Sequence, residues 1–182
     1  KEEENWIEYP ELKSKVEKEA QEFLSKKKSF SAYRNFLIMA LLTLQPPTRF
    51  GNYLDMAYKN KSSLKNGGRG LKKTKNYILY NNNQENPEYT FIFNKYKTAK
   101  TLGQITRVIE NDTLNKLLHK WFEQYNTKKQ DFLVNSNGSL TTQTGITNGL
   151  SSISKKLFNK HLTGNSFRHI FITHFLSTNP SI

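Results

Sequence analysis

The stretch NSFRHIFITHFL, residues 165–176, combines charged and apolar side chains in a way that constrains the fold. Arg168 and His169 are adjacent, and His174 follows five residues after His169. The apolar residues around them are sufficient for the interior of a domain: Phe167, Ile170, Phe171, Ile172, Phe175 and Leu176. Because an arginine among so many apolar neighbours is costly without a role, we expect a buried helix that holds Arg168 for a function.

The composition of the whole chain is typical of one globular domain. Its 182 residues are enough for a real core, and although only 35% are hydrophobic, 12 Phe and 9 Tyr supply large buried areas. The absence of Cys excludes disulfides and thiolate metal sites, and it favours an intracellular location. No apolar run approaches the roughly 20 residues that a membrane-spanning helix needs.

The net charge of +13 is the strongest global signal. Such an excess of positive charge favours a polyanionic partner, either nucleic acid or an acidic membrane surface. A second explanation stays open, because an AT-rich genome would enrich Lys and Asn without any selection for binding. A membrane-surface binder would also be expected to carry a basic amphipathic helix with exposed aromatic residues, and the chain has none in its sequence pattern.

The sequence pattern predicts two helices in the first part of the chain. The pattern predicts an amphipathic helix over residues 11–24 and a helix over residues 30–44 that is apolar nearly all round and therefore central. The prolines of QPPT, residues 45–48, end the second helix. The following residues, 49–58, are expected to form a short helix with Arg49 at its N-terminal edge.

The sequence pattern predicts a small sheet in the middle of the chain. Residues 59–75 are basic and Gly-rich, which predicts a surface loop, and short β-type runs follow at residues 76–80, 88–94 and 105–110. Helices are expected again over residues 112–125, with Asp112 or Thr113 as the cap, and over residues 144–162 before the final helix. The fold class expected is mainly α with a small three-stranded antiparallel β-sheet.

Three cationic motifs occur in a characteristic order. They are PPTRFGNYLDM with Arg49, NKYKTAKT with Lys97 between two expected strands, and NSFRHIFITHFL with Arg168. Together they resemble the catalytic domain of the tyrosine recombinases, the phage-integrase family. The local sequence of the motifs is most similar to members from viruses or mobile elements. The resemblance runs from about Phe30 to the end. It implies the DNA breaking–rejoining catalytic core over residues 29–182, preceded by a helical segment or linker over residues 1–28.

The resemblance implies a catalytic role for each motif. Arg49 and Arg168 would clamp the two non-bridging oxygens of a DNA phosphate, on which negative charge builds during attack by a Tyr oxygen. Lys97 would be the general acid that protonates the leaving 5′-oxygen, with Lys95 and Lys100 as competitors in the same turn. The reaction needs no metal, and no nucleotide cofactor is required because the phosphotyrosine linkage conserves the bond energy.

Two positions depart from the family pattern. The first position of the box, usually His, is Asn165, whose amide can donate a hydrogen bond to phosphate but cannot carry a proton near neutral pH. The family nucleophile is a Tyr that follows the box helix, whereas the last Tyr here is Tyr125. We therefore expect a chain cut before its nucleophile, which binds double-stranded DNA without cleaving it and is a monomer, the full-length protein being a tetramer on paired sites.

The remaining candidate residues have supporting roles. His169 is expected to hydrogen-bond inside the site and to orient Arg168 or a neighbouring loop, His174 to be packed, and His119 and His161 to lie at the surface without metal spacing. A set of basic residues is expected along the DNA backbone, adding affinity and salt dependence without reading bases: Lys61, Lys65, Arg69, Lys72, Lys73 and Lys75.

Two other functions on the same fold stay open. A type IB topoisomerase shares the chemistry, but it usually has Lys where this chain has Asn165. A DNA-binding module without catalysis is also compatible with Asn165. In each case the expected location is intracellular and DNA-associated, in the cytoplasm or nucleus of a host or in a virus.

Overall fold

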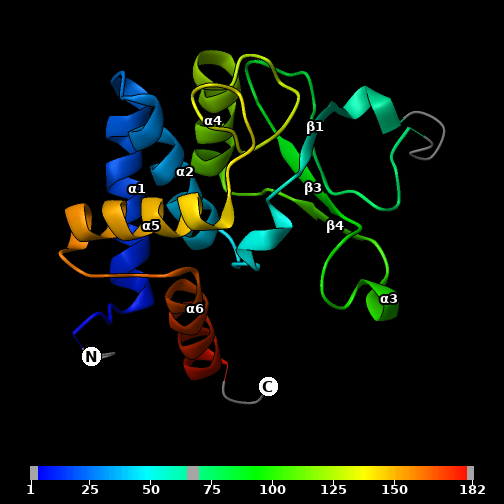
Figure 1. Ribbon diagram of the computed structural model, residues 1–182. Helices are drawn as coiled ribbons and strands as arrows, with labels where there is room; N and C mark the ends of the chain where they lie inside the picture. The colour runs from blue at the N-terminus through cyan, green and yellow to red at the C-terminus, as the bar shows by residue number, and fades with distance from the viewer. Residues whose placement is uncertain (1–3, 65–69, 180–182) are drawn as a thin grey trace. The chain divides into compact units, whose positions relative to one another are not determined.

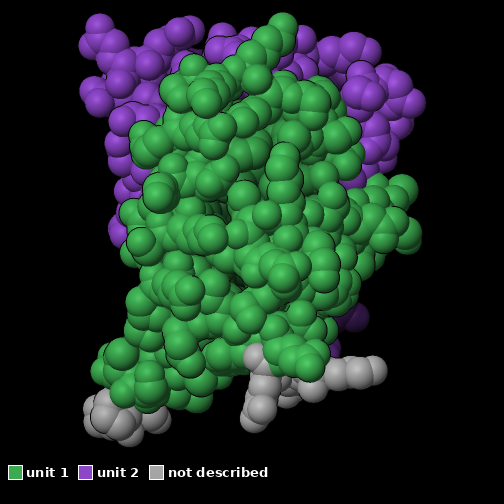
Figure 2. Space-filling view, turned by 90° about the vertical axis from the view of Figure 1, so that its left-hand side faces the viewer, with its two compact units in different colours: residues 1–49, 142–182 green, residues 50–141 purple. Residues whose placement is uncertain are grey.

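A computed structural model describes residues 4–64 and 70–179 of the chain, which divides into two compact units (Figures 1 and 2). The first unit comprises Lys1–Arg49 and Thr142–Ile182, and the second comprises residues 50–141. The structure is mainly helical with one small sheet, as expected from the sequence. Over the described ranges, no helix combines the length and apolar character needed to cross a membrane.

The first unit is built around one apolar helix, as expected. This helix, α2 (Phe30–Thr43), is buried throughout its second half, and it contacts α1 (Tyr9–Ser25), α5 (Gln143–Phe158) and α6 (Gly164–Thr178). Ser29 caps its start by accepting a hydrogen bond from the backbone N–H of Ala32, and the helix ends before the two prolines. An all-round apolar pattern therefore predicted the centre of this unit correctly.

Helices α2 and α5 approach closely at Gly149. A Cβ atom added at Gly149 would lie 2.3 Å from Oδ1 and 2.8 Å from Cγ of Asn35 on α2. These distances are shorter than a van der Waals contact, so the absence of a side chain at Gly149 allows the two helices to pack.

The sheet of the second unit has four strands in the order β1-β2-β3-β4. The expected antiparallel strands are present as β2 (Tyr77–Tyr80), β3 (Tyr89–Phe93) and β4 (Ile105–Val108). The prediction of three strands was wrong, because β1 (Ala57–Asn60) pairs in parallel with β2 and makes the sheet mixed.

Strand β1 lies across the boundary of two expected segments, because the sequence pattern predicts a short helix over residues 49–58 and a surface loop over residues 59–75. In the first of these segments only a single 3₁₀ turn, η1 (Phe50–Asn52), forms, and Asp55 adopts the left-handed conformation with φ 56° before the strand begins. A four-residue strand is too short to show a reliable alternation of polar and apolar residues, and its parallel partner lies twenty residues away in sequence.

One face of the sheet is packed with aromatic side chains. The ring centroids of Tyr53 and Phe91 are 5.2 Å apart, and those of Phe91 and Phe132 are 5.9 Å apart. Phe122 continues this cluster from η3 (Trp121–Tyr125), a π-helical turn that follows α4 (Asp112–Lys120). The cap of α4 is Asn111, whose side chain accepts a hydrogen bond from the Leu114 N–H, and neither Asp112 nor Thr113 has that role.

The final helix, α6, is not buried, which corrects the expectation from its apolar sequence. Among its described residues only Phe167 and Ile170 are buried, and one side carries exposed apolar residues: Ile172 at 48%, Phe175 at 41% and Leu176 at 53% exposure. Phe171 and His174 contact α1, where the Tyr9 ring lies 5.4 Å from the Phe171 ring and 5.2 Å from the His174 ring. His174 is thus packed, as expected.

Candidate nucleic-acid interface

Lys97 lies where the sequence placed it, in the connection between β3 and β4. Its side chain is exposed in a turn directly before the short helix α3 (Ala99–Leu102), and Lys95 and Lys100 are exposed in the same connection. Within the described residues Lys97 has no ion pair. Its ammonium group is therefore available to an external anion.

The buried side chain of Asn76 fixes this connection. Its Nδ2 donates hydrogen bonds to the carbonyl oxygens of Asn52, at 3.0 Å, and of Lys95, at 2.9 Å. Its Oδ1 accepts from the backbone N–H groups of Asn94, at 2.8 Å, and Lys95, at 2.7 Å. One side chain therefore ties the turn that follows Arg49 in sequence to the turn that carries Lys97. No local sequence pattern indicates this role, because an Asn before a strand is an ordinary turn residue.

A second asparagine extends the network to the basic segment. Asn94 donates through Nδ2 to the carbonyl oxygens of Lys75, at 2.9 Å, and Lys72, at 3.3 Å. Gln104 donates to Asn94 Oδ1 at 2.7 Å from the far end of the connection. The backbone of residues 72–75 and the Lys97 turn are thus held together by side-chain amides.

A cavity of about 320 Å³ lies beside this network. Its lining includes Asn52 and Asn76 together with the cations Lys75 and Lys95 and one carboxylate, Asp55. The Lys75 Nζ is 3.9 Å from Asp55 Oδ1, an exposed pair that contributes little stability. The two lysines give the cavity the chemistry to hold a phosphate oxygen.

The basic residues expected along DNA differ in their surroundings. Lys61 lies 3.8 Å from the Glu88 carboxylate, and Lys75 pairs with Asp55 as above. Lys72 and Lys73 are exposed and make no ion pair with any described residue. Lys65 and Arg69 lie outside the described residues.

The two arginines both belong to the first unit. Arg49 is exposed directly before η1, and Arg168 is half-buried in the first turns of α6. Neither has a hydrogen-bonding or acidic partner in the part of the chain that the structure describes, and they share no partner there. Both guanidinium groups therefore have unused donors.

The start of α6 is well defined by a capping box. The Ser166 N–H donates to Thr163 Oγ1 at 3.2 Å, and the Thr163 N–H donates to Ser166 Oγ at 3.0 Å. Asn165 and His169 line a cavity of about 310 Å³ beside this turn, to which Trp6 and His161 also contribute.

The histidines differ in part from expectation. The His169 side chain is exposed and makes no hydrogen bond with any described residue, so the hydrogen bond expected inside the site is absent there. His161 is exposed, and its Nδ1 lies 2.7 Å from Ser151 Oγ. His119 is half-buried, not at the surface, with its ring 5.7 Å from that of Tyr80. Over residues 4–64 and 70–179, no group of three or more His, Asp or Glu residues is arranged to hold a metal ion.

Partial burial affects the ionisation of several side chains. Burial, with further contributions from Tyr80 and Glu123, raises the pKa of Tyr58 to about 12, so its phenol stays protonated near neutral pH. Burial also raises the pKa of Tyr80 and lowers that of Arg34 on α2. None of these three shifts produces an activated nucleophile at neutral pH.

No family model, curated protein sequence or solved structure matches this chain.

Proposed function

We propose that this chain carries the catalytic cations of a tyrosine recombinase, an enzyme that cuts and rejoins double-stranded DNA through a 3′-phosphotyrosine intermediate. One observation carries the proposal: Arg49, Lys97 and Arg168 have no acidic partner among the described residues. Each also adjoins an ordered element, η1, α3 or the first turns of α6. Cations kept free in this way are suited to an anion supplied from outside.

The roles follow from the charge that develops on a phosphate under attack. Two planar guanidinium groups, Arg49 and Arg168, stabilise the non-bridging oxygens, and Lys97 protonates the leaving oxygen. Asn165 donates a hydrogen bond to the same phosphate through its amide. The Asn76 network supports the proposal because it holds the Lys97 turn in a single geometry before DNA binds.

The DNA affinity of four variants tests the proposal. Arg49→Ala, Arg168→Ala and Lys97→Ala should each weaken binding to a duplex and reduce the slope of log affinity against log salt by about one. The matched control is Lys18→Ala, an exposed lysine of α1 that makes no ion pair in the described chain, which should leave both quantities unchanged. Equal effects for Lys18 and the three candidates would leave only a general basic surface and refute the proposal.

Arginine geometry gives a second test. Arg49→Lys and Arg168→Lys keep the charge but lose the planar pair of donors, so their affinities should fall toward those of the alanine variants. Full affinity in both lysine variants would indicate simple charge attraction, as in a DNA-binding module without catalysis.

Covalent chemistry is tested by denaturing gel electrophoresis after incubation with nicked and intact duplexes. Residues 1–182 contain no Tyr after Tyr125, so we expect binding without a covalent protein–DNA adduct. An adduct would show that one of the nine tyrosines of this chain is the nucleophile and would require new roles for these residues.

A further inference from the structure

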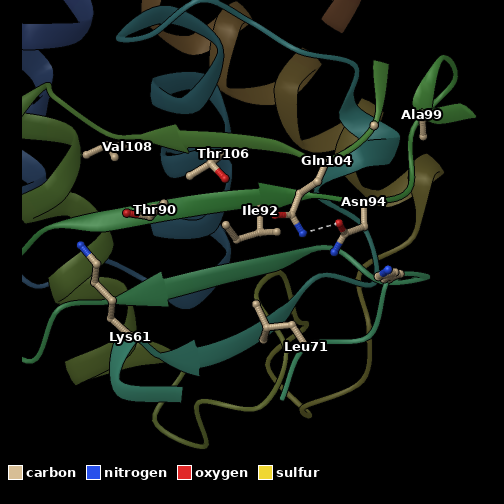
Figure 3. A pocket seen from close by; sticks show the side chains of 11 residues that line it. Lys61, Leu71, Thr90, Ile92, Asn94, Ala99, Gln104, Thr106 and Val108 are labelled. Atoms are coloured by element: carbon tan, nitrogen blue, oxygen red, sulfur yellow. Dashed lines mark hydrogen bonds between the residues drawn. The ribbon is translucent and has the colours of Figure 1, made fainter. Parts of the chain in front are cut away.

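The open face of the sheet in the second unit forms a trough of about 850 Å³ (Figure 3). Its floor is formed by side chains of β3 and β4 that point away from the aromatic cluster: Thr90, Ile92, Thr106 and Val108. Lys61 lies at one end, and Asn94 and Gln104 lie at the other. The trough is separate from the cavity beside the Lys97 turn, with which it shares no lining residue.

The floor of the trough is rigid and partly apolar. Ile92 is 4% exposed and packs in a cluster with Tyr77 and Leu79 of β2, and Leu71 packs against that cluster from the connecting segment. Val108 is 45% exposed at the edge of the floor. An exposed valine beside a packed apolar floor offers a place for apolar side chains from another molecule.

The charge of the trough has one sign. Among the described residues, its lining contains Lys61 and Lys73 and no Asp or Glu. Lys61 does lie 3.8 Å from Glu88, but both side chains are more than 40% exposed, so this pair exchanges readily for another carboxylate. A ligand that fits the trough therefore carries negative charge beside apolar groups.

Nucleic acid does not fit this description. The described part of the lining has no aromatic side chain on which a base could stack, and a duplex backbone presents mainly charged phosphates to the apolar Ile92 and Val108. The amide groups of Asn94 and Gln104 at the end of the trough can instead hydrogen-bond to a peptide backbone.

We propose that the trough is a docking site for an acidic, apolar peptide segment of a partner protein. The apolar side chains of the segment lie over Leu71, Ile92 and Val108, and its carboxylates lie beside Lys61 and Lys73. No residue proposed for catalysis lines the trough, so the proposal does not depend on the DNA chemistry proposed above. Lys61 and Lys73 also belong to the set expected along the DNA backbone, and competition by duplex DNA therefore separates the two roles.

A display library of random peptides, selected against the immobilised chain, supplies the probe. We expect the enriched sequences to combine Asp or Glu with Leu, Ile or Val. Their affinities, measured by fluorescence anisotropy with synthetic peptides, should fall about tenfold or more in Val108→Glu and in Lys73→Glu. The matched controls Leu102→Glu and Lys72→Glu, exposed neighbours outside the trough, should change affinity by less than about twofold.

A folding check accompanies the affinities. Each variant is compared with the wild type by its circular dichroism spectrum, and Val108→Ser replaces Val108→Glu if the glutamate variant does not fold. Val108→Ser should also weaken the peptide, because it removes the apolar contact without adding charge.

Three outcomes would overturn the proposal. The first is that no peptide is enriched. The second is that the enriched peptides are basic, or that they bind Val108→Ser as tightly as wild type. The third is that Lys72→Glu and Lys73→Glu weaken peptide binding equally. If duplex DNA also competes with the peptide, the last outcome would assign the trough to the DNA-binding surface. If the peptide test fails while Arg49→Ala and Arg168→Ala still weaken DNA binding as expected, the docking site is refuted and the proposed function is not.

Discussion

Asn76 and the backbone of Lys95 form a reciprocal pair of hydrogen bonds, with Nδ2 donating to the Lys95 carbonyl at 2.9 Å and Oδ1 accepting from its N–H at 2.7 Å. The side-chain amide thereby takes the place of a strand partner for the first residues of the turn that leads to Lys97. The same amide also holds the carbonyl of Asn52, three residues after Arg49. One buried side chain of the second unit therefore sets the geometry of two functional segments.

Removal of this amide should destabilise the second unit. Asn76→Ala leaves two N–H groups and two carbonyls without their partner, at a cost of about 3 kcal/mol in the free energy of unfolding. Urea unfolding measures this cost. The control Asn137→Ala removes an exposed turn amide and should cost less than about 0.5 kcal/mol. Similar losses for the two variants would contradict the role assigned to Asn76.

The close approach at Gly149 predicts a coupling between two helices. Gly149→Ala should not show the stability gain of about 1 kcal/mol that Gly→Ala brings in a helix interior, because the new Cβ would displace the Asn35 side-chain amide. Asn35→Ala in the same background removes the overlapping atoms, so the double variant should be more stable than Gly149→Ala alone. Additive effects would show that the two side chains do not meet.

The exposure of α6 predicts unequal effects along one helix. Phe167→Ala removes a side chain that is 1% exposed and should cost about 3 to 5 kcal/mol. Leu176→Gln replaces a side chain that is 53% exposed and should change stability by less than about 0.5 kcal/mol. Thermal or urea unfolding of both variants distinguishes this arrangement from the buried helix that the sequence predicted, in which both changes would be severe.

The raised pKa of Tyr58 predicts a loss of stability at alkaline pH. Folding favours the protonated phenol, so this contribution is fully present below the ordinary Tyr value near 10 and is lost as pH rises from there through about 12. Unfolding midpoints across this range should fall more steeply in wild type than in Tyr58→Phe, which has no phenol to ionise at that position. An identical pH dependence in the two proteins would refute the assignment.

The features that could be read from the sequence are those in which local pattern and packing agree. Helix α2 is apolar on all sides and is central, and the runs that became β2, β3 and β4 are bounded by turn residues. Helix α6 is also rich in apolar residues, but neighbouring helices cover only part of its surface, because the sequence pattern cannot specify which faces of a helix have a neighbour.

The candidate site was only partly predictable for a similar reason. The positions of Arg49, Lys97 and Arg168 at the edges of elements follow from prolines, turns and helix starts, which are local signals. Asn76 was missed because its four hydrogen bonds go to residues at least eighteen positions away in sequence. Neither arginine has an acidic partner among the described residues, and this likewise depends on which carboxylates the fold brings near, which no local pattern indicates.

A double-mutant cycle on DNA affinity tests the central claim, that Arg49 and Arg168 act on one phosphate. The affinities of wild type, Arg49→Ala, Arg168→Ala and the double variant for one duplex are measured at one salt concentration. Two groups that bind the same phosphate couple, so the double variant should lose less than the sum of the single losses, by about 1 kcal/mol or more. Losses that add to within about 0.4 kcal/mol would mean that the two arginines bind separately and would contradict the account.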